Sequence, residues 1–211
     1  GHQWTDEGYV TDYLEKSYGG FVRSYPYDGD DALAYASSGF IWDAVLRAGL
    51  TFRDYGEFVQ AKIEPSSATW TDIYNDYLND TTEVSIRAAT ELHTLEPYLC
   101  PTFVGFPGKV QDVYRAREFI RELEAFEESG ELPNFTIMLL PNDHTVGARE
   151  GYPTPRAAVA DNDLALGRIV EAVSKSRFWP ETAIFVVQDD PQAGFDHVDG
   201  RRTVALCISP Y

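Results

Sequence analysis

Carboxylate and imidazole side chains gather in three short segments in the second half of the chain. Asp143-His144 follows one apolar run, Asp189-Asp190 follows the next, and a glycine-containing loop then leads to Asp196-His197. In α/β proteins, ligands bind beyond the carboxyl ends of the strands. Carboxylates with imidazoles suit zinc, manganese or iron, whereas an all-oxygen set suits magnesium or calcium. The pattern predicts a site for divalent metal ions, whose expected ligands are Asp143, His144, Asp189, Asp190 and His197.

Each segment also has a simpler interpretation. A single loop histidine is usually solvated or hydrogen-bonded, and a carboxylate pair before Pro191 could form a turn or a helix cap. Two Asp-His pairs, each just beyond a predicted strand, favour metal ligands over these interpretations. Asp196 could orient the neighbouring imidazole or only shape the turn. His2 could approach the same site, and Arg202 could hold a phosphate or be simply solvated.

The elements that must position these residues are clearest after residue 100. Apolar residues at helical spacing predict helices over 109–128 and 154–173, the second opened by Thr154-Pro155. Strands are predicted from the apolar runs at 135–140, 182–187 and 203–208. Strands that alternate with long helices favour parallel pairing, and continuous apolar runs are typical of a sheet covered on both faces. The predicted fold is a three-layer α/β/α sandwich with a mostly parallel central sheet.

The first hundred residues are rich in aromatics, Gly and Asp and have weaker periodicity. The predicted elements are helices over 4–16, 40–48 and 70–78 and a strand over 50–58, while 79–96 is ambiguous. Tyrosines in this part could line a carbohydrate or protein site, or pack within a loop-rich cap. They are Tyr9, Tyr13, Tyr18, Tyr25, Tyr27 and Tyr35.

Composition bounds the domain count and the partners. A chain of 211 residues that is 44% hydrophobic suits one core, so 1–211 is predicted to be one α/β domain. Within it, 1–100 is the loop-rich part and 101–211 the regular part. The formal net charge of −17 disfavours binding to nucleic acid or to an anionic membrane. Bound divalent cations can invert the local field of an acidic site, so a phosphate substrate remains compatible with this charge.

Two further features of the sequence concern membranes and cysteines. No apolar run reaches the length that spans a bilayer. Cys100 and Cys207 do not form a CxxC motif, which argues against a cysteine-based zinc site. They could form one long-range disulfide or remain two free thiols.

Several of these segments resemble the alkaline phosphatase superfamily. The helix motif Asp-x-x-Leu-Gly-x-(Ile/Leu)-Val lies within 162–170, and Trp-x-x-Thr at 179–182 leads into the strand that ends in the carboxylate pair. The segment 194–198, followed by 204–210, is more similar to the phosphoesterase branch, which includes phospholipase C-type and acid phosphatase-type enzymes. The segments 1–4 and 9–13 are similar to bacterial phosphoesterase-like proteins, some of which also carry a β-propeller.

This resemblance implies a two-metal phosphoesterase acting on a small-molecule or lipid phosphate ester in the periplasm or outside the cell. By position, Asp189 and Asp190 match the ligand pair after the strand, Asp143 or His144 matches the preceding ligand, and His197 matches the late histidine. The family's first strand, with an early ligand and a Ser or Thr nucleophile, is not found here. The nucleophile is therefore expected upstream of Gly1, in a catalytic domain truncated at both ends.

Two alternatives remain open. A sulfatase, phosphonatase or phosphomutase of the same superfamily would share the metal ligands and differ in nucleophile and cap. A non-catalytic carbohydrate- or protein-binding module could also retain the fold.

Overall fold

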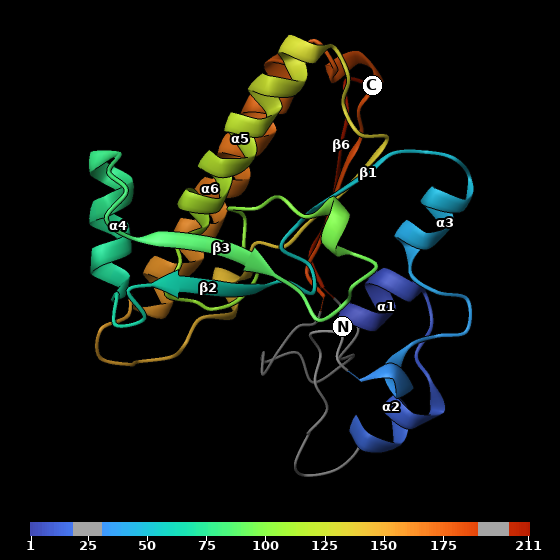
Figure 1. Ribbon diagram of the computed structural model, residues 1–211, viewed down its shortest axis with the longest axis horizontal. Coiled ribbons are helices and arrows are strands. Elements are labelled where there is room, and N and C mark those ends of the chain that lie inside the picture. The colour runs from blue at the N-terminus through green and yellow to red at the C-terminus, as the bar shows by residue number, and fades with distance from the viewer. Residues whose placement is uncertain (19–30, 190–202) are drawn as a thin grey trace.

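Helices and short strands alternate along the chain in the computed structural model, which has mixed α/β character (Figure 1). The structure describes residues 1–18, 31–189 and 203–211. The described strands are β1 (Phe52–Tyr55), β2 (Gln60–Glu64), β3 (Ser85–Ala89), β4 (Phe135–Met138), β5 (Ile184–Val187) and β6 (Ala205–Ile208). β1 pairs in parallel with β4, whereas β2 with β3 and β5 with β6 are antiparallel.

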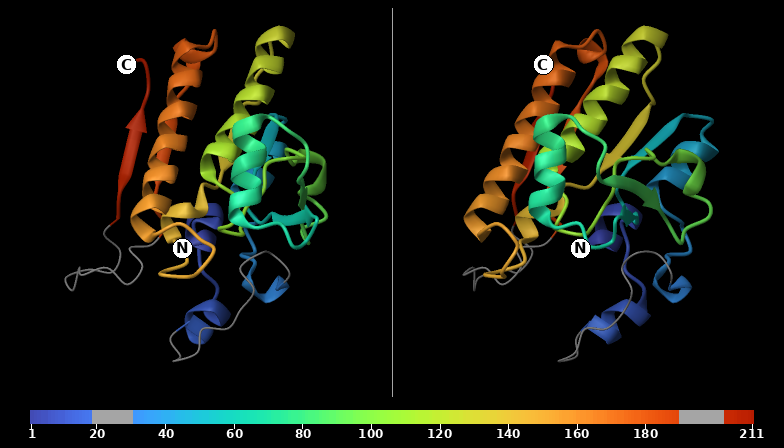
Figure 2. Two further views of the ribbon diagram at one scale, coloured as in Figure 1. Left: turned by 90° about the vertical axis from the view of Figure 1, so that its left-hand side faces the viewer. Right: turned by 60° about the vertical axis from the view of Figure 1, so that its left-hand side comes forward.

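The longest helices lie side by side on one side of the molecule (Figure 1, Figure 2). The helices are α1 (His2–Glu7), α2 (Asp12–Tyr18), α3 (Ile41–Arg47), α4 (Trp70–Asn79), α5 (Asp112–Ser129) and α6 (Pro155–Lys175). Short 3-10 turns occur at η1 (Ala32–Ala34), η2 (Glu96–Tyr98), η3 (Pro141–His144) and η4 (Trp179–Glu181). The helices predicted over 70–78, 109–128 and 154–173 are confirmed, with ends shifted by a few residues.

The pair α5–α6 forms because each helix carries one apolar stripe and clear end signals. Thr154 caps α6 by accepting a hydrogen bond from the Ala157 N–H at 3.3 Å, and Gly130 ends α5 in the left-handed region with a φ of 80°. The stripes pack together around Tyr55 of β1 to form one core. Its helical members are Val113, Ala116, Phe119, Leu123, Ala165, Ile169 and Val173. This core holds the two long helices against β1.

The parallel pair β1–β4 brings two carboxyl ends to one edge. Phe52 lies opposite Phe135 and Tyr55 opposite Met138. At the other end of the pair, the Thr51 N–H and hydroxyl both donate to Asn134 Oδ1 at 3.0 Å, which fixes the register. The residues that follow β1 and β4 therefore emerge at the same edge of this sheet.

The first half of the chain departs from the prediction in three ways. Gly8, with a φ of 63°, ends α1, so the single helix expected over 4–16 is two helices. Phe40 is the N-cap of α3 and not the first residue of the helix, and its N–H donates to Asp43 Oδ2 at 2.9 Å. The strand expected over 50–58 is shorter, and the ambiguous segment 79–96 contains β3.

The second half departs from it in the sheet. The described strands form three separate two-stranded ladders, so a three-layer sandwich is not confirmed. β5 was expected to be buried, yet Phe185 is 76% and Val187 51% exposed, because alternate residues of this strand face outward. Cys100 is a buried and Cys207 an exposed free thiol. Within the described parts of the chain, no helix combines the length and apolar character needed to cross a membrane.

Candidate metal centre

The residues that follow β4 and β5 lie next to each other, although the two strands belong to different two-stranded sheets. We call this place the edge. Asp143 lies in η3 beyond β4, and Asp189 follows β5 directly. Gln188 connects the two strand ends, because its Nε2 donates to Asp143 Oδ2 at 3.3 Å. Burial raises the pKa of Asp143, and the negative charge of Asp189 acts in the same direction. The structure thus brings these two predicted ligands close enough for the charge of Asp189 to act on Asp143.

His2 joins this edge from the first helix. Its Nδ1 lies 2.6 Å from Glu57 Oε1, and its Nε2 lies 3.5 Å from Asp189 Oδ2. Gly1 packs on the same carboxylate, where an added Cβ would lie 2.3 Å from Asp189 Oδ2. Burial alone would lower the pKa of His2, but the hydrogen bond and charge of Glu57, together with the charge of Asp189, outweigh it and raise the pKa. His2 therefore links the α1 helix to the ends of β1 and β5 and favours its protonated form.

Glu57 reaches His2 because the chain turns sharply after β1. Gly56 has a φ of 99°, and a Cβ there would lie 3.1 Å from the Phe103 ring, so glycine suits this position. Phe58 also has a left-handed φ, of 53°, which is costly for a bulky residue. The Glu57 N–H donates to Asp54 Oδ1 at 3.1 Å. These constraints direct the Glu57 side chain toward α1.

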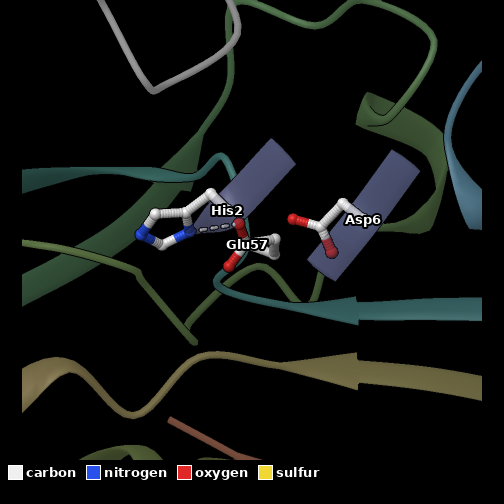
Figure 3. Close-up of side chains that lie close together, drawn as sticks. All are labelled: His2, Asp6 and Glu57. Carbon is white, nitrogen blue, oxygen red and sulfur yellow. Dashed lines mark hydrogen bonds and ion pairs between the residues drawn. The ribbon is translucent and has the colours of Figure 1, made fainter. Parts of the chain in front are cut away.

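A group of buried carboxylates lies behind His2. Figure 3 shows Glu57 between His2 and Asp6, with the Asp6 carboxylate directed toward Glu57. Asp6 is 1%, Asp54 0% and Glu57 5% exposed. Burial, followed by the nearby charge of Glu57, raises the pKa of both Asp6 and Asp54 well above the usual range. Asp6, Asp54 and Glu57 were not among the predicted site residues, although Glu57 follows a strand end just as Asp143 and Asp189 do.

The loop that carries Asp143 is held by a buried polar network. Asp161 of α6 accepts hydrogen bonds from the Asp112 N–H at 2.7 Å and from Asn142 Nδ2 at 2.8 Å. Asp112 accepts the Asn142 N–H at 3.0 Å and an Arg115 Nη1 hydrogen bond at 2.9 Å. Arg115 is fully buried and also donates to the carbonyl oxygens of Val104, Gly105, Pro107 and Val110. The network fixes the residue next to Asp143 against both long helices.

The remaining predicted residues are placed as follows. His144 is exposed, its Nδ1 lies 2.9 Å from the Thr145 carbonyl oxygen, and its ring meets Phe106 edge-on at 5.5 Å between centroids. Asp190, Asp196, His197 and Arg202 lie outside the described residues.

The donor set at this edge suits a divalent cation. The ligand atoms of His2, Asp6 and Glu57 all lie within 4.8 Å of one another. Asp143 and Asp189 add two more carboxylates on the other side of His2. Imidazole and carboxylate donors suit zinc and manganese, and an imidazole held between two carboxylates can carry a proton.

Comparison with models of protein families, with curated proteins and with solved structures gives no match to this chain.

Proposed function

We propose that this chain is the metal-binding part of a phosphoric ester hydrolase of the alkaline phosphatase type. One observation carries the proposal: Glu57, Asp143 and Asp189 each lie just beyond the carboxyl end of a different strand and are connected through His2 and Gln188. The resemblance of 162–170 and 179–190 to that superfamily supports the same reaction. It also supports a three-layer arrangement for the whole domain and a location in the periplasm or outside the cell.

The residues at the edge have distinct proposed roles. Asp143 and Asp189 hold a divalent cation, and Asp190 and His197 complete the ligand set of one or two ions. Cations held there would polarise the phosphoryl oxygens and stabilise the charge that develops in an in-line displacement. His2, held between Glu57 and Asp189, donates a hydrogen bond from Nε2 toward the ester. The proposed nucleophile is the Ser or Thr hydroxyl that the resemblance implies.

Binding of an unreactive substrate analogue tests the proposal, because it needs the metal edge and no nucleophile. Phenylphosphonate is titrated calorimetrically into the chain with zinc, with manganese and with a chelator. We expect binding that requires metal and is lost in the double variant Asp143→Asn/Asp189→Asn. The variant Asp163→Asn is the matched control, because Asp163 is an exposed carboxylate on α6.

Two results would contradict the proposal. One is phenylphosphonate binding that is absent, or that survives the double substitution. The other is a metal-independent interaction with glycans, which would favour a binding module. In a protein that contains the nucleophile, release of nitrophenol from phosphate monoesters, phosphate diesters and sulfate esters then defines the ester class, and preferential cleavage of the sulfate ester would indicate a sulfatase.

A further inference from the structure

The buried carboxylates behind His2 lack the partners that buried charges normally have. No donor in the described part of the chain reaches either oxygen of Asp6, or Oδ2 of Asp54. Across residues 1–18, 31–189 and 203–211, His2 is the cationic side chain that forms an ion pair with this group, through Glu57. Buried carboxylates are normally paired with cations, saturated with donors or bound to metal. The group therefore carries more negative charge than its described neighbours balance.

Two arrangements could relieve this imbalance. A proton could be shared between Asp6 and Glu57, or a cation could lie between them. A shared proton would satisfy one carboxylate oxygen and leave the others without donors. A divalent cation would satisfy oxygens from both residues at once, and the His2 imidazole lies beside Glu57.

We infer that His2, Asp6 and Glu57 form a second binding site for a divalent cation, separate from the edge at Asp143 and Asp189. Zinc ligands about 2.1 Å from one ion in tetrahedral geometry lie about 3.4 Å apart. The three ligand atoms lie within 4.8 Å of one another, so small side-chain rotations close them around an ion. Asp6 is 1% exposed and directed at Glu57, which makes this a buried and pre-arranged set (Figure 3). One nitrogen and two carboxylates suit zinc or manganese better than calcium.

The inferred ion would act on the edge through the two nitrogens of His2. Coordination by Nδ1 replaces the contact with Glu57 and leaves the proton on Nε2, which lies 3.5 Å from Asp189 Oδ2. His2 and Asp6 both belong to α1, whereas Glu57 belongs to the loop after β1. The ion would therefore fasten α1 to this loop and hold the imidazole in one orientation. This inference concerns metal binding and does not depend on hydrolysis.

Metal titration of single-site variants tests the inference. Zinc and manganese are titrated into the tag-free, chelator-treated chain, with binding followed by calorimetry and the rise in melting temperature followed by circular dichroism. We expect the ion at His2, Asp6 and Glu57 to bind the double variant Asp143→Asn/Asp189→Asn with the same affinity as the unchanged chain. Asp6→Asn should weaken this ion by at least about 100-fold, since a change that only touches a ligand costs 10–100-fold. In the presence of chelator, Asp6→Asn should melt no lower than the unchanged chain, because the substitution removes a buried carboxyl group that has no donor among the described residues.

Asp76→Asn is the matched control for a buried carboxylate. Asp76 accepts hydrogen bonds from Thr81 Oγ1 and from the Glu83 N–H, both at 2.7 Å, so it has its own donors. This variant should keep the full metal-induced rise in melting temperature. X-ray absorption of the zinc-loaded double variant should show nitrogen and oxygen ligands only.

Three results would overturn the inference. They are no metal-induced rise in the unchanged chain, a rise that persists when Asp6→Asn is combined with Asp143→Asn/Asp189→Asn, and a rise that is already absent in Asp143→Asn/Asp189→Asn. The last result would leave the proposed hydrolase intact. Conversely, an unchanged chain that binds the Asp6-dependent ion but no phenylphosphonate would contradict the hydrolase and support this second site.

Discussion

Asp161 offers a direct test of how α6 supports the candidate metal centre. Its carboxylate accepts the Asp112 N–H at 2.7 Å, Asn142 Nδ2 at 2.8 Å and the Val113 N–H at 3.3 Å. Hydrogen bonds to a charged group contribute about 1.5–3 kcal/mol each, and the long one contributes less. Repulsion between the Asp161 and Asp112 carboxylates offsets part of this sum. We therefore expect Asp161→Ala to lower the free energy of unfolding by about 3 kcal/mol, and Asp161→Asn by about half as much.

Urea unfolding followed by circular dichroism measures this loss. Asp163→Ala is the control, because Asp163 is exposed on the same helix and its removal should change stability by less than about 0.5 kcal/mol. A loss of less than about 1 kcal/mol in Asp161→Ala, or a loss no larger than that of Asp163→Ala, would refute this role of Asp161. Such a result would mean that the η3 loop does not depend on the cap that α6 supplies to α5.

Three other changes have expected outcomes. Trp42 is 1% exposed and its Nε1 has no partner within the described residues, so Trp42→Phe should cost under about 1.5 kcal/mol and Trp42→Ala about 3–5 kcal/mol in urea unfolding. Glu122 accepts hydrogen bonds from Arg53 and Tyr55, so Glu122→Gln should lower the free energy of unfolding by about 1–3 kcal/mol. A lower thermal midpoint measures this loss. In chelator, stability should fall as pH rises above about 4, because the raised pKa of Asp6 means that the folded state keeps a proton that the unfolded state has released. Urea midpoints between pH 5 and pH 8 check this sign, and an increase with pH would contradict it.

The elements that were predicted correctly are those with local signals. α6 begins at Thr154-Pro155 and α5 ends at Gly130, and both helices have a single apolar stripe long enough to be distinguished from a strand. The predictions that were wrong concern segments whose structure depends on tertiary contacts. Gly8 could have been an internal helix residue, and only its left-handed conformation shows that it ends α1. The continuous apolar run of β5 predicted burial on both faces, but such a run does not reveal which neighbours cover it.

The candidate metal centre was predictable to the same extent. Asp143 and Asp189 follow apolar runs, and the rule for strand ends brings them to one edge. Glu57 also follows a strand end, but the expected strand over 50–58 included Glu57, whereas β1 ends at Tyr55, just before Gly56. Asp6 carries no local signal at all, because its approach to Glu57 depends on how α1 meets the loop after β1. A ligand set drawn from distant segments is fixed by tertiary packing and not by spacing.

The carboxylates in the interior are of two kinds. Some have hydrogen-bond donors and support helix ends and loops, whereas others lack donors and are candidates for metal binding. Asp76 is buried and Asp161 partly buried, and both accept hydrogen bonds from donors that fix helix ends and loops, so their charges are satisfied by the fold itself. Asp6 and Asp54 are 1% and 0% exposed, yet Asp6 and one oxygen of Asp54 have no donor among the described residues. Unfavourable burial of this kind persists only where another requirement maintains it. Both residues adjoin Glu57, which contacts His2 beside Asp189. Binding of a cation at this place would be such a requirement.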